Sequence, residues 1–209
     1  MSQVSFIGLG VMGFPMAGHL QTKGGHDVAV FNRTEAKAQA WAERFGGRHA
    51  PTPGEAAEDA DVVFCCVGND DDVRSVVYGD TGILSAMKPG ALLVDHTTAS
   101  ATLARELAAA CDGKGIRFLD APVSGGQAGA EGGVLTVMVG GEETAFRDAE
   151  PVMSAYARRV GLMGPVGSGQ LAKMMNQICI AGLVQGLAEA VQFGQRAGLD
   201  IETVVDVIS

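Results

Sequence analysis

The sequence predicts an α/β fold in which a doubly wound, mostly parallel sheet is followed by a long interdomain helix and an incomplete all-α domain. Short apolar runs alternate with stretches of helical periodicity up to residue 160. These runs are apolar throughout, as are strands that helices cover on both faces. From residue 168 to about residue 196 a helical pattern continues, interrupted only by glycines. We therefore place a first domain at 1–164 and the start of a second at 165–209.

The N-terminal elements complete a βαβ unit. Residues 4–8 are predicted as a strand, 11–23 as a helix and 27–31 as a second strand. A helix over 34–45 follows, and Thr34 is expected to cap it. Further strands are predicted at 62–67, 91–95, 117–119, 134–139 and 158–160, with helices at 70–78, 100–114 and 142–154 and a glycine-rich loop at 120–133.

Glycine and proline mark the boundary between the two domains. Five such residues fall within positions 161–169: Gly161, Gly164, Pro165, Gly167 and Gly169. This composition is typical of turns. The helix that follows would be a rod of roughly 40 Å at 1.5 Å per residue. Another helix begins near Asp200, and because the chain ends soon afterwards we expect the second domain to be incomplete.

Composition and charge exclude several classes of protein. With 47% hydrophobic and 19% charged residues, the chain is globular and not disordered. A formal charge of −9 argues against nucleic acid as a partner. No apolar run reaches the roughly 20 residues of a membrane span, so we expect no membrane partner and a cytoplasmic location. The histidines and cysteines lack metal-binding spacing, and we expect no metal.

The turn after the first strand carries a dinucleotide-binding fingerprint. Residues 8–13 fit G-x-G-x-x-G, with Gly8, Leu9, Gly10, Val11, Met12 and Gly13 in order. The first glycine allows the tight turn, the second lets a pyrophosphate approach the backbone, and the third lets helix and strand pack closely. Free N–H groups and the helix dipole favour the phosphates. We therefore predict that these residues bind a dinucleotide in a Rossmann-type domain.

The residues after the second strand favour NADP(H) over NAD(H). In NAD-binding units an acidic residue there hydrogen-bonds the ribose 2′-hydroxyl. This chain has Asn32, Arg33 and Thr34 instead. Arg33 offers a 2′-phosphate a planar set of donors and Thr34 offers a hydroxyl, whereas a carboxylate would repel it. The alternative is a solvated Arg33 at a helix start, which leaves NAD(H) possible.

Two further loops follow strands at the same edge of the sheet, where ligands bind in open α/β folds. Val67 and Asn69 are assigned to the cofactor site. The acidic run at 70–72 is expected to stabilise the first turn of a helix. In the loop at 95–100, Thr98 is placed to meet the nicotinamide ribose, and N-capping of the next helix is the competing role for the hydroxyls there.

Lys173 makes the second domain a candidate for catalysis. It lies near the start of the long helix, with Asn176 and Gln177 on the same side. That side continues through four apolar residues, which are Ile180, Leu183, Val184 and Leu187. We expect this stripe to be buried, so that desolvation lowers the pKa of Lys173 toward the range useful for proton transfer. A lysine that extends into solvent is the alternative.

Three motifs occur in order along the chain. They are Phe6-Ile-Gly-Leu-Gly-Val-Met-Gly13, Asp120-Ala-Pro-Val-Ser-Gly-Gly126 and Gly164-Pro-Val-Gly-Ser-Gly-Gln-Leu-Ala-Lys-Met-Met-Asn176. Over essentially the whole chain the sequence resembles the β-hydroxyacid dehydrogenases, the family of 3-hydroxyisobutyrate dehydrogenase, tartronate semialdehyde reductase and glyoxylate/succinic semialdehyde reductase. The resemblance implies that Lys173 exchanges a proton with the substrate during hydride transfer and that Asn176 hydrogen-bonds the substrate. It also implies that Ser124, Gly125 and Gly126 hold the substrate carboxylate and that Thr98 lies beside the nicotinamide.

The same resemblance sets the expected function. It implies an NADP(H)-dependent oxidoreductase that interconverts a small 3-hydroxy acid and its semialdehyde or oxo acid. The residues at 32–34 resemble those of the NADPH-using branch of the family. The resemblance also implies further helices that close the substrate cleft, and a homodimer or homotetramer in the full-length form. The alternatives are a non-catalytic dinucleotide-binding or interaction module of the same fold, and an imine reductase, although imine reductases generally lack the helix lysine.

Overall fold

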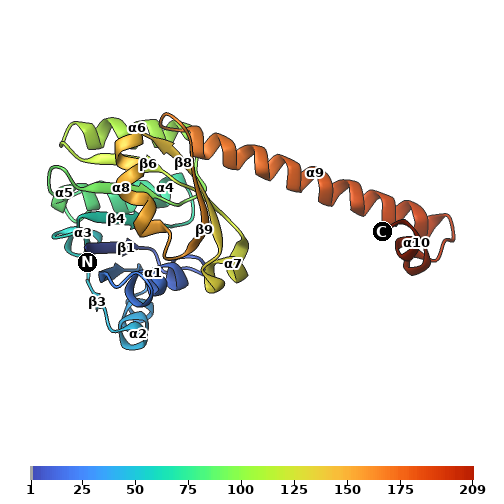
Figure 1. The fold of residues 1–209 in the computed structure, drawn as a ribbon, viewed down its shortest axis with the longest axis horizontal. Helices are drawn as coiled ribbons and strands as arrows, with labels where there is room; N and C mark the ends of the chain where they lie inside the picture. The colour runs from blue at the N-terminus through green and yellow to red at the C-terminus, as the bar shows by residue number, and fades with distance from the viewer. Residues whose placement is uncertain (1) are drawn as a thin grey trace. The chain divides into compact units, whose positions relative to one another are not determined.

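The computed structural model describes residues 2–209, which form two compact units. The first unit ends at Lys173 and the second covers Met174–Ser209. All described strands belong to the first unit, in which helices cover both faces of one sheet (Figure 1). The second unit holds most of α9 (Ser168–Arg196) and all of α10 (Ile201–Ile208).

The sheet has the order β3-β2-β1-β4-β5-β6-β8-β7, with β9 paired to β8. Its described strands are β1 (Gln3–Ile7), β2 (Asp27–Phe31), β3 (Arg48–His49), β4 (Val62–Cys65), β5 (Leu92–Asp95), β6 (Arg117–Asp120), β7 (Val123–Ser124), β8 (Leu135–Gly141) and β9 (Ala157–Gly164). Neighbouring strands from β3 through β6 are parallel, whereas β8 is antiparallel to β6 and β7. The predicted doubly wound, mostly parallel fold is confirmed. Because β1 lies between β2 and β4, a ligand-binding crevice is expected at the carboxyl ends of these strands.

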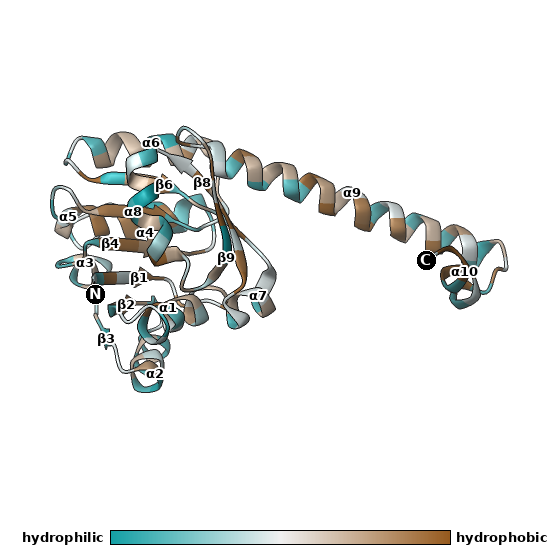
Figure 2. Cartoon of the chain, viewed as in Figure 1, coloured by the Kyte–Doolittle hydropathy of each residue, from teal (hydrophilic) through white to brown (hydrophobic). Residues whose placement is uncertain are grey.

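Two apolar clusters fill the space between the sheet and its helices. Alternate residues of a strand point to opposite faces, so Phe6 of β1 joins one cluster and its neighbour Ile7 joins the other. Figure 2 shows β1 and β4 as hydrophobic strands. The helices of the first unit are α1 (Gly13–Thr22), α2 (Glu35–Phe45), α3 (Pro53–Ala57), α4 (Asp70–Val77), α5 (Ile83–Ala86), α6 (Ala101–Asp112), α7 (Gly126–Gly132) and α8 (Glu143–Met153), together with the first residues of α9.

Short elements are where the structure departs from the predicted ones. The predicted loop at 120–133 contains β7 and α7, and β3, α3 and α5 were also not predicted. Helix α7 includes glycines at 126, 129 and 132, which disfavour a helix. A tertiary contact supports it, because His19 Nε2 of α1 lies 3.1 Å from the carbonyl oxygen of Ala130 and 3.0 Å from that of Glu131. The predicted cap of α2 is wrong in one respect, since the Thr34 side chain makes no capping hydrogen bond.

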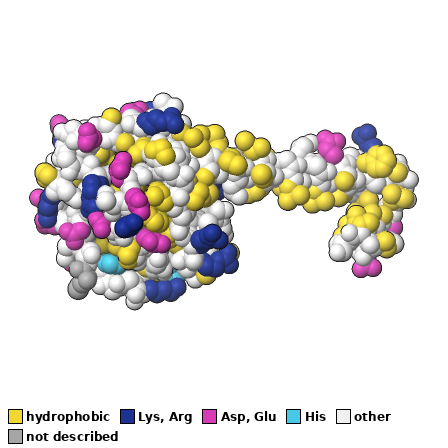
Figure 3. Space-filling view, turned by 45° about the horizontal axis from the view of Figure 1, so that its top comes forward, with side chains coloured by type: hydrophobic (Ala, Val, Ile, Leu, Met, Phe, Trp, Pro, Cys, Tyr) yellow, Lys and Arg dark blue, Asp and Glu magenta, His cyan; other side chains and the backbone are white. Residues whose placement is uncertain are grey.

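In the second unit most apolar side chains of α9 and α10 are exposed (Figure 3). We expected the stripe at residues 180–187 to be buried, and this is wrong, because Ile180, Leu183, Val184 and Leu187 are 48–73% exposed. Contrary to the expectation from the sequence, α9 is long and apolar enough to cross a membrane by length and composition, a test that core helices of globular proteins also pass.

Candidate active site

The glycine turn after β1 has the geometry that its fingerprint requires. Gly8 has a φ of +98°, and a Cβ there would overlap the carbonyl oxygen of Cys66. A Cβ at Gly13 would overlap the carbonyl oxygen of Gly8. A Cβ at Gly10, in contrast, would meet no atom within 4 Å. The fold itself needs Gly8 and Gly13, while Gly10 leaves open space in which a ligand can approach the backbone.

A cleft of about 390 Å³ opens beside this turn. Residues 8, 10–13 and 32–34 line it, and so does Val67, so the structure brings most of the predicted cofactor residues together. Cys66 also lines the cleft, and burial raises the pKa of its thiol to about 12. The thiol is therefore neutral at pH 7. An open backbone turn at the start of α1, with Arg33 in the lining of the same cleft, fits the pyrophosphate of a dinucleotide.

Leu9 and Asn32 connect the glycine turn to the end of β2. Leu9 is buried in the core, and its N–H donates to Asn32 Oδ1 at 2.9 Å. Asn32 Nδ2 donates in turn to the carbonyl oxygen of Thr34 at 3.0 Å. Asn32 therefore holds the turn against the segment that carries Arg33. Leu9, predicted as a cofactor residue, does not line the cleft, because its side chain packs in the core.

Arg33 lines the cleft beside Asp72, a carboxylate to which the sequence assigned helix stabilisation and no part in the cofactor site. Its Nη1 is 3.3 Å from Asp72 Oδ1, and the two side chains are 88% and 32% exposed. Asp72 belongs to the first turn of α4 and lines the same cleft, as does Lys37. The position of Asp72 at the start of the helix that follows β4, at the ligand-binding edge, was the signal available in the sequence.

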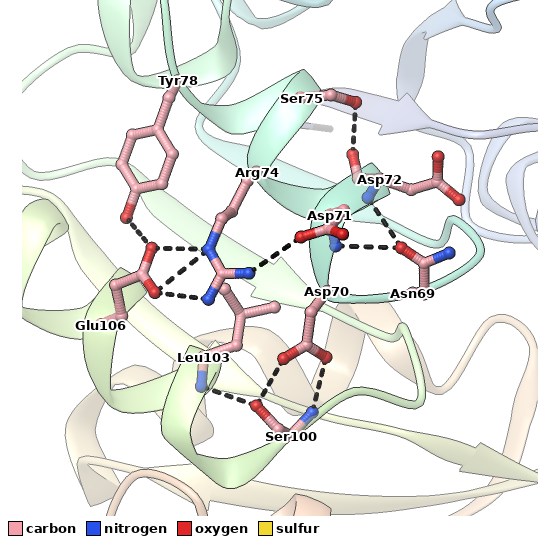
Figure 4. A network of polar contacts seen from close by, with 10 residues as sticks. All are labelled: Asn69, Asp70, Asp71, Asp72, Arg74, Ser75, Tyr78, Ser100, Leu103 and Glu106. Atoms are coloured by element: carbon pink, nitrogen blue, oxygen red, sulfur yellow. Dashed lines mark hydrogen bonds and ion pairs between the residues drawn. The ribbon is translucent and has the colours of Figure 1, made fainter.

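Asn69 and the acidic run organise the start of α4 (Figure 4). Asn69 Oδ1 accepts hydrogen bonds from the N–H groups of Asp71 at 2.9 Å and Asp72 at 3.0 Å, so Asn69 caps the helix and does not line the cleft. Asp70 accepts from the Ser100 hydroxyl at 2.5 Å and from its N–H at 2.9 Å, which lowers the pKa of Asp70. The Ser100 hydroxyl also caps α6. N-capping therefore accounts for Ser100, whereas Thr98 is exposed.

The first turn of α9 is fixed to the sheet by Asp120. The carboxylate of this buried residue accepts the N–H of Gly167 at 2.6 Å and that of Gln170 at 2.9 Å. Lys173 follows one turn later and is 8% exposed. Burial lowers the pKa of Lys173, as predicted. The physical reason is the packing of residues 168–173 within the first unit and not the apolar stripe, which is exposed.

The remaining predicted substrate residues lie at the end of β7, at the start of α7 and on α9. Ser124 ends β7, opposite Thr136 of β8, and is half-buried. Gly125 and Gly126 have φ values of +132° and +62°, which favour glycine, and lead into α7. Asn176 lies on α9 in the second unit, where its Nδ2 donates to Gln177 Oε1 at 3.4 Å. The roles of these residues toward a substrate stay predictions.

Comparison with known proteins identifies the family. The NAD-binding domain of 6-phosphogluconate dehydrogenase matches residues 3–164, and a second family, described as NAD-binding of NADP-dependent 3-hydroxyisobutyrate dehydrogenase, matches residues 167–209. An uncharacterized oxidoreductase from Shewanella frigidimarina is 63% identical over all 209 residues, which span 72% of its length. The chain belongs to the β-hydroxyacid dehydrogenase family. It is an NAD(P)-dependent enzyme of that family, and all of α9 falls within the second match.

Two named members of the β-hydroxyacid dehydrogenase family are similar over the whole chain. The NAD-dependent L-serine dehydrogenase of Pseudomonas aeruginosa is 38% identical over 100% of this chain and 69% of its own. The 3-hydroxyisobutyrate dehydrogenase of Mycobacterium tuberculosis, solved with L-serine, is 36% identical with a TM-score of 0.91, over 100% of this chain and 70% of its own. An imine reductase from Myxococcus stipitatus also reaches a TM-score of 0.91 over 100% of this chain and 70% of its own, but at 20% identity this shows the fold alone.

Proposed function

We propose that this β-hydroxyacid dehydrogenase uses NADP(H) to interconvert a small 3-hydroxy acid and the matching semialdehyde or oxo acid, with Lys173 as general acid/base. The buried position of Lys173, one turn after the anchored start of α9, carries the proposal. A buried amine whose pKa is lowered can exchange protons near neutral pH, whereas a solvated lysine would stay protonated.

The cofactor cleft supports the choice of NADP(H). Gly10 leaves room for the pyrophosphate at the start of α1, and Arg33, Thr34 and Lys37 line the end of the cleft where a 2′-phosphate would lie. Thr98 would contact the nicotinamide side. When bound, the nicotinamide supplies or accepts a hydride at C4. NAD(H) remains the alternative cofactor.

The substrate roles follow from the chemistry of a hydroxy acid. Ser124 and the backbone N–H groups of Gly125 and Gly126 would hold the carboxylate, and Asn176 would hydrogen-bond the reacting oxygen. In oxidation the hydroxyl proton passes to the neutral Lys173 amine. The hydride leaves the carbon that bears this hydroxyl, and that carbon becomes a carbonyl carbon. In reduction the Lys173 ammonium returns the proton to the oxygen. The relatives named for L-serine and 3-hydroxyisobutyrate support a small carboxylate-bearing substrate.

Other expectations stay proposals. We place the NADP-binding domain at 1–164 and the start of the all-α domain at 165–209, with further family helices completing the substrate cleft. A homodimer or homotetramer in a cytoplasmic location, without nucleic acid or a membrane as partner, completes the proposal.

Initial rates on a substrate panel test this function. The panel holds glyoxylate, succinic semialdehyde, tartronate semialdehyde and methylmalonate semialdehyde with NADPH or NADH, and L-serine and 3-hydroxyisobutyrate with the oxidised cofactors. We expect turnover of at least one of these acids and a preference for the phosphorylated cofactor of about tenfold or more. Equal use of both cofactors would contradict the role of Arg33. Reduction of a cyclic imine without turnover of any acid would favour the imine reductase alternative.

A further inference from the structure

A buried glutamine joins α9 to the loop after β5. The side chain of Gln170 is 1% exposed, its Nε2 donates to the carbonyl oxygen of Thr97 at 2.7 Å, and its Oε1 accepts the N–H of Ala99 at 3.0 Å. These two bonds bracket Thr98, which is exposed. One amide therefore fixes the backbone on both sides of the residue assigned to the nicotinamide.

The same helical turn carries Lys173. Residues three apart on a helix lie on one side, so Gln170 and Lys173 are neighbours along α9. The backbone N–H of Gln170 donates to Asp120 Oδ2 at 2.9 Å. Gln170 thus contacts the sheet through its backbone and the loop through its side chain, and any shift of this turn moves Lys173 relative to Thr98.

Other contacts hold the loop to the sheet and to α4. The Thr97 hydroxyl accepts the N–H of Val67 at 3.1 Å, the Thr97 N–H donates to Asp95 Oδ1 at 2.9 Å, and Asp70 binds Ser100. Among the hydrogen bonds of residues 2–209, those of Gln170 are the ones that connect this loop to α9. Asp120 of β6 holds α9 to the sheet, and Asp95 of β5 holds the loop to the same sheet. Gln170 adds the direct hydrogen-bonded link between loop and helix.

We propose that Gln170 is a positioning residue that sets the relation between the Thr98 loop and the Lys173 amine. This rests on the proposed roles of Lys173 and Thr98. Hydride and proton transfer both need reacting atoms within about 3–3.5 Å, and displacements of about 1 Å can lower rates about 100-fold. Gln170 touches neither substrate nor cofactor in this proposal and acts through the two elements that it joins.

Single-turnover oxidation of NADPH with saturating substrate separates positioning from stability. Gln170→Leu keeps the size of the side chain but removes both hydrogen bonds. We expect the rate constant to fall about 10–100-fold, while the amplitude, the amount of NADPH oxidised per mole of total protein, is kept. Gln3→Leu is the matched control, because Gln3 is an exposed glutamine at the start of β1, whereas the glycine turn follows the end of this strand. The rate constant of this variant should equal that of wild type. A purely structural role would lower the amplitude and the melting temperature and leave the rate constant intact, which would overturn the proposal.

Gln170→Glu provides a conditional rescue. A protonated carboxyl can accept from Ala99 and donate to Thr97, whereas the ionised form loses the donor. The rate of this variant relative to wild type should fall as pH rises, while that of Gln3→Glu should not. A ratio independent of pH would contradict the two-bond role.

A double variant and Lys173→Ala separate the failure of this proposal from that of the function. If Gln170 acts through the loop, its substitution should have a smaller effect in a Thr98→Ala background than in wild type; effects that multiply would overturn the proposal. Loss of turnover in Lys173→Ala with wild-type rates in Gln170→Leu would overturn the positioning role alone. Full turnover in Lys173→Ala would overturn the proposed function and this inference with it.

Discussion

Arg33 and Asp72 form an ion pair of 3.3 Å at the mouth of the cofactor cleft, although they lie 39 residues apart in the chain. The carboxylate orients the guanidinium, but it also places a negative charge where a 2′-phosphate would bind. We therefore expect cofactor preference to depend on the pair and not on Arg33 alone. An exposed pair of this kind contributes little to stability, so its effect should be seen in binding.

Loss of the Arg33 charge should weaken NADPH binding, and loss of the Asp72 charge should strengthen it. Arg33→Ala should raise KM for NADPH about tenfold or more, and Asp72→Asn should lower it severalfold, with KM for NADH changed less than about twofold in both. Asp71→Asn is the control, since Asp71 is exposed and pairs with Arg74. Steady-state kinetics with both cofactors test this prediction. Equal changes in KM for NADPH and NADH would show that the pair does not interact with the 2′-phosphate.

The glycines of the turn should separate folding from binding. A Cβ at Gly10 meets no atom, so Gly10→Ala should keep the wild-type melting temperature and weaken NADPH binding about tenfold or more. Gly8→Ala should lower the free energy of unfolding by about 1–3 kcal/mol, and with it the melting temperature. The reason is that φ at Gly8 is positive and that a Cβ there would overlap the carbonyl oxygen of Cys66. Thermal denaturation and cofactor titration test both variants. A destabilised Gly10→Ala, or a Gly8→Ala with the stability of wild type, would contradict the geometry.

The pH dependence of turnover should be opposite in the two directions. Burial lowers the pKa of Lys173. Reduction needs the ammonium, so its rate should fall as pH rises through that lowered pKa, whereas oxidation needs the neutral amine and should accelerate over the same range. Profiles of kcat in both directions measure this. A pH dependence of the same sign in both directions would exclude Lys173 as the group that titrates.

Asp95 should make the fold less stable as pH rises. Burial raises its pKa from 3.8 to about 7. Between these values the unfolded chain releases the proton and the folded chain keeps it, so stability present at pH 4 is lost by pH 7, by at most ~1.4 kcal/mol per pH unit. Asp95→Asn should remove that loss, and Asp112→Asn, an exposed control, should not. Parallel curves of unfolding free energy against pH for wild type and Asp95→Asn would contradict it.

Local patterns predicted the long elements, and tertiary contacts decided the rest. Helix α9 begins and ends where the sequence placed it, because its helical pattern is continuous from residue 168 to 196. Helix α7 was missed since its three glycines disfavour a helix and His19, far away in sequence, supports it. The contact of Asp72 with Arg33 and the contacts of Gln170 were not predicted for the same reason. Their partners, Arg33 and the Thr98 loop, come from distant segments that no spacing rule connects.

The most direct test of the proposed mechanism is the turnover of Lys173→Ala with NADPH and the best semialdehyde substrate. Lys88→Ala is the control, since it removes an exposed lysine paired with Asp59. If Lys173 is the general acid/base, kcat should fall about 10²–10⁴-fold while the Kd for NADPH stays within about twofold and the Lys88 variant keeps wild-type kcat. A kcat for Lys173→Ala equal to that of wild type would contradict the proposed mechanism.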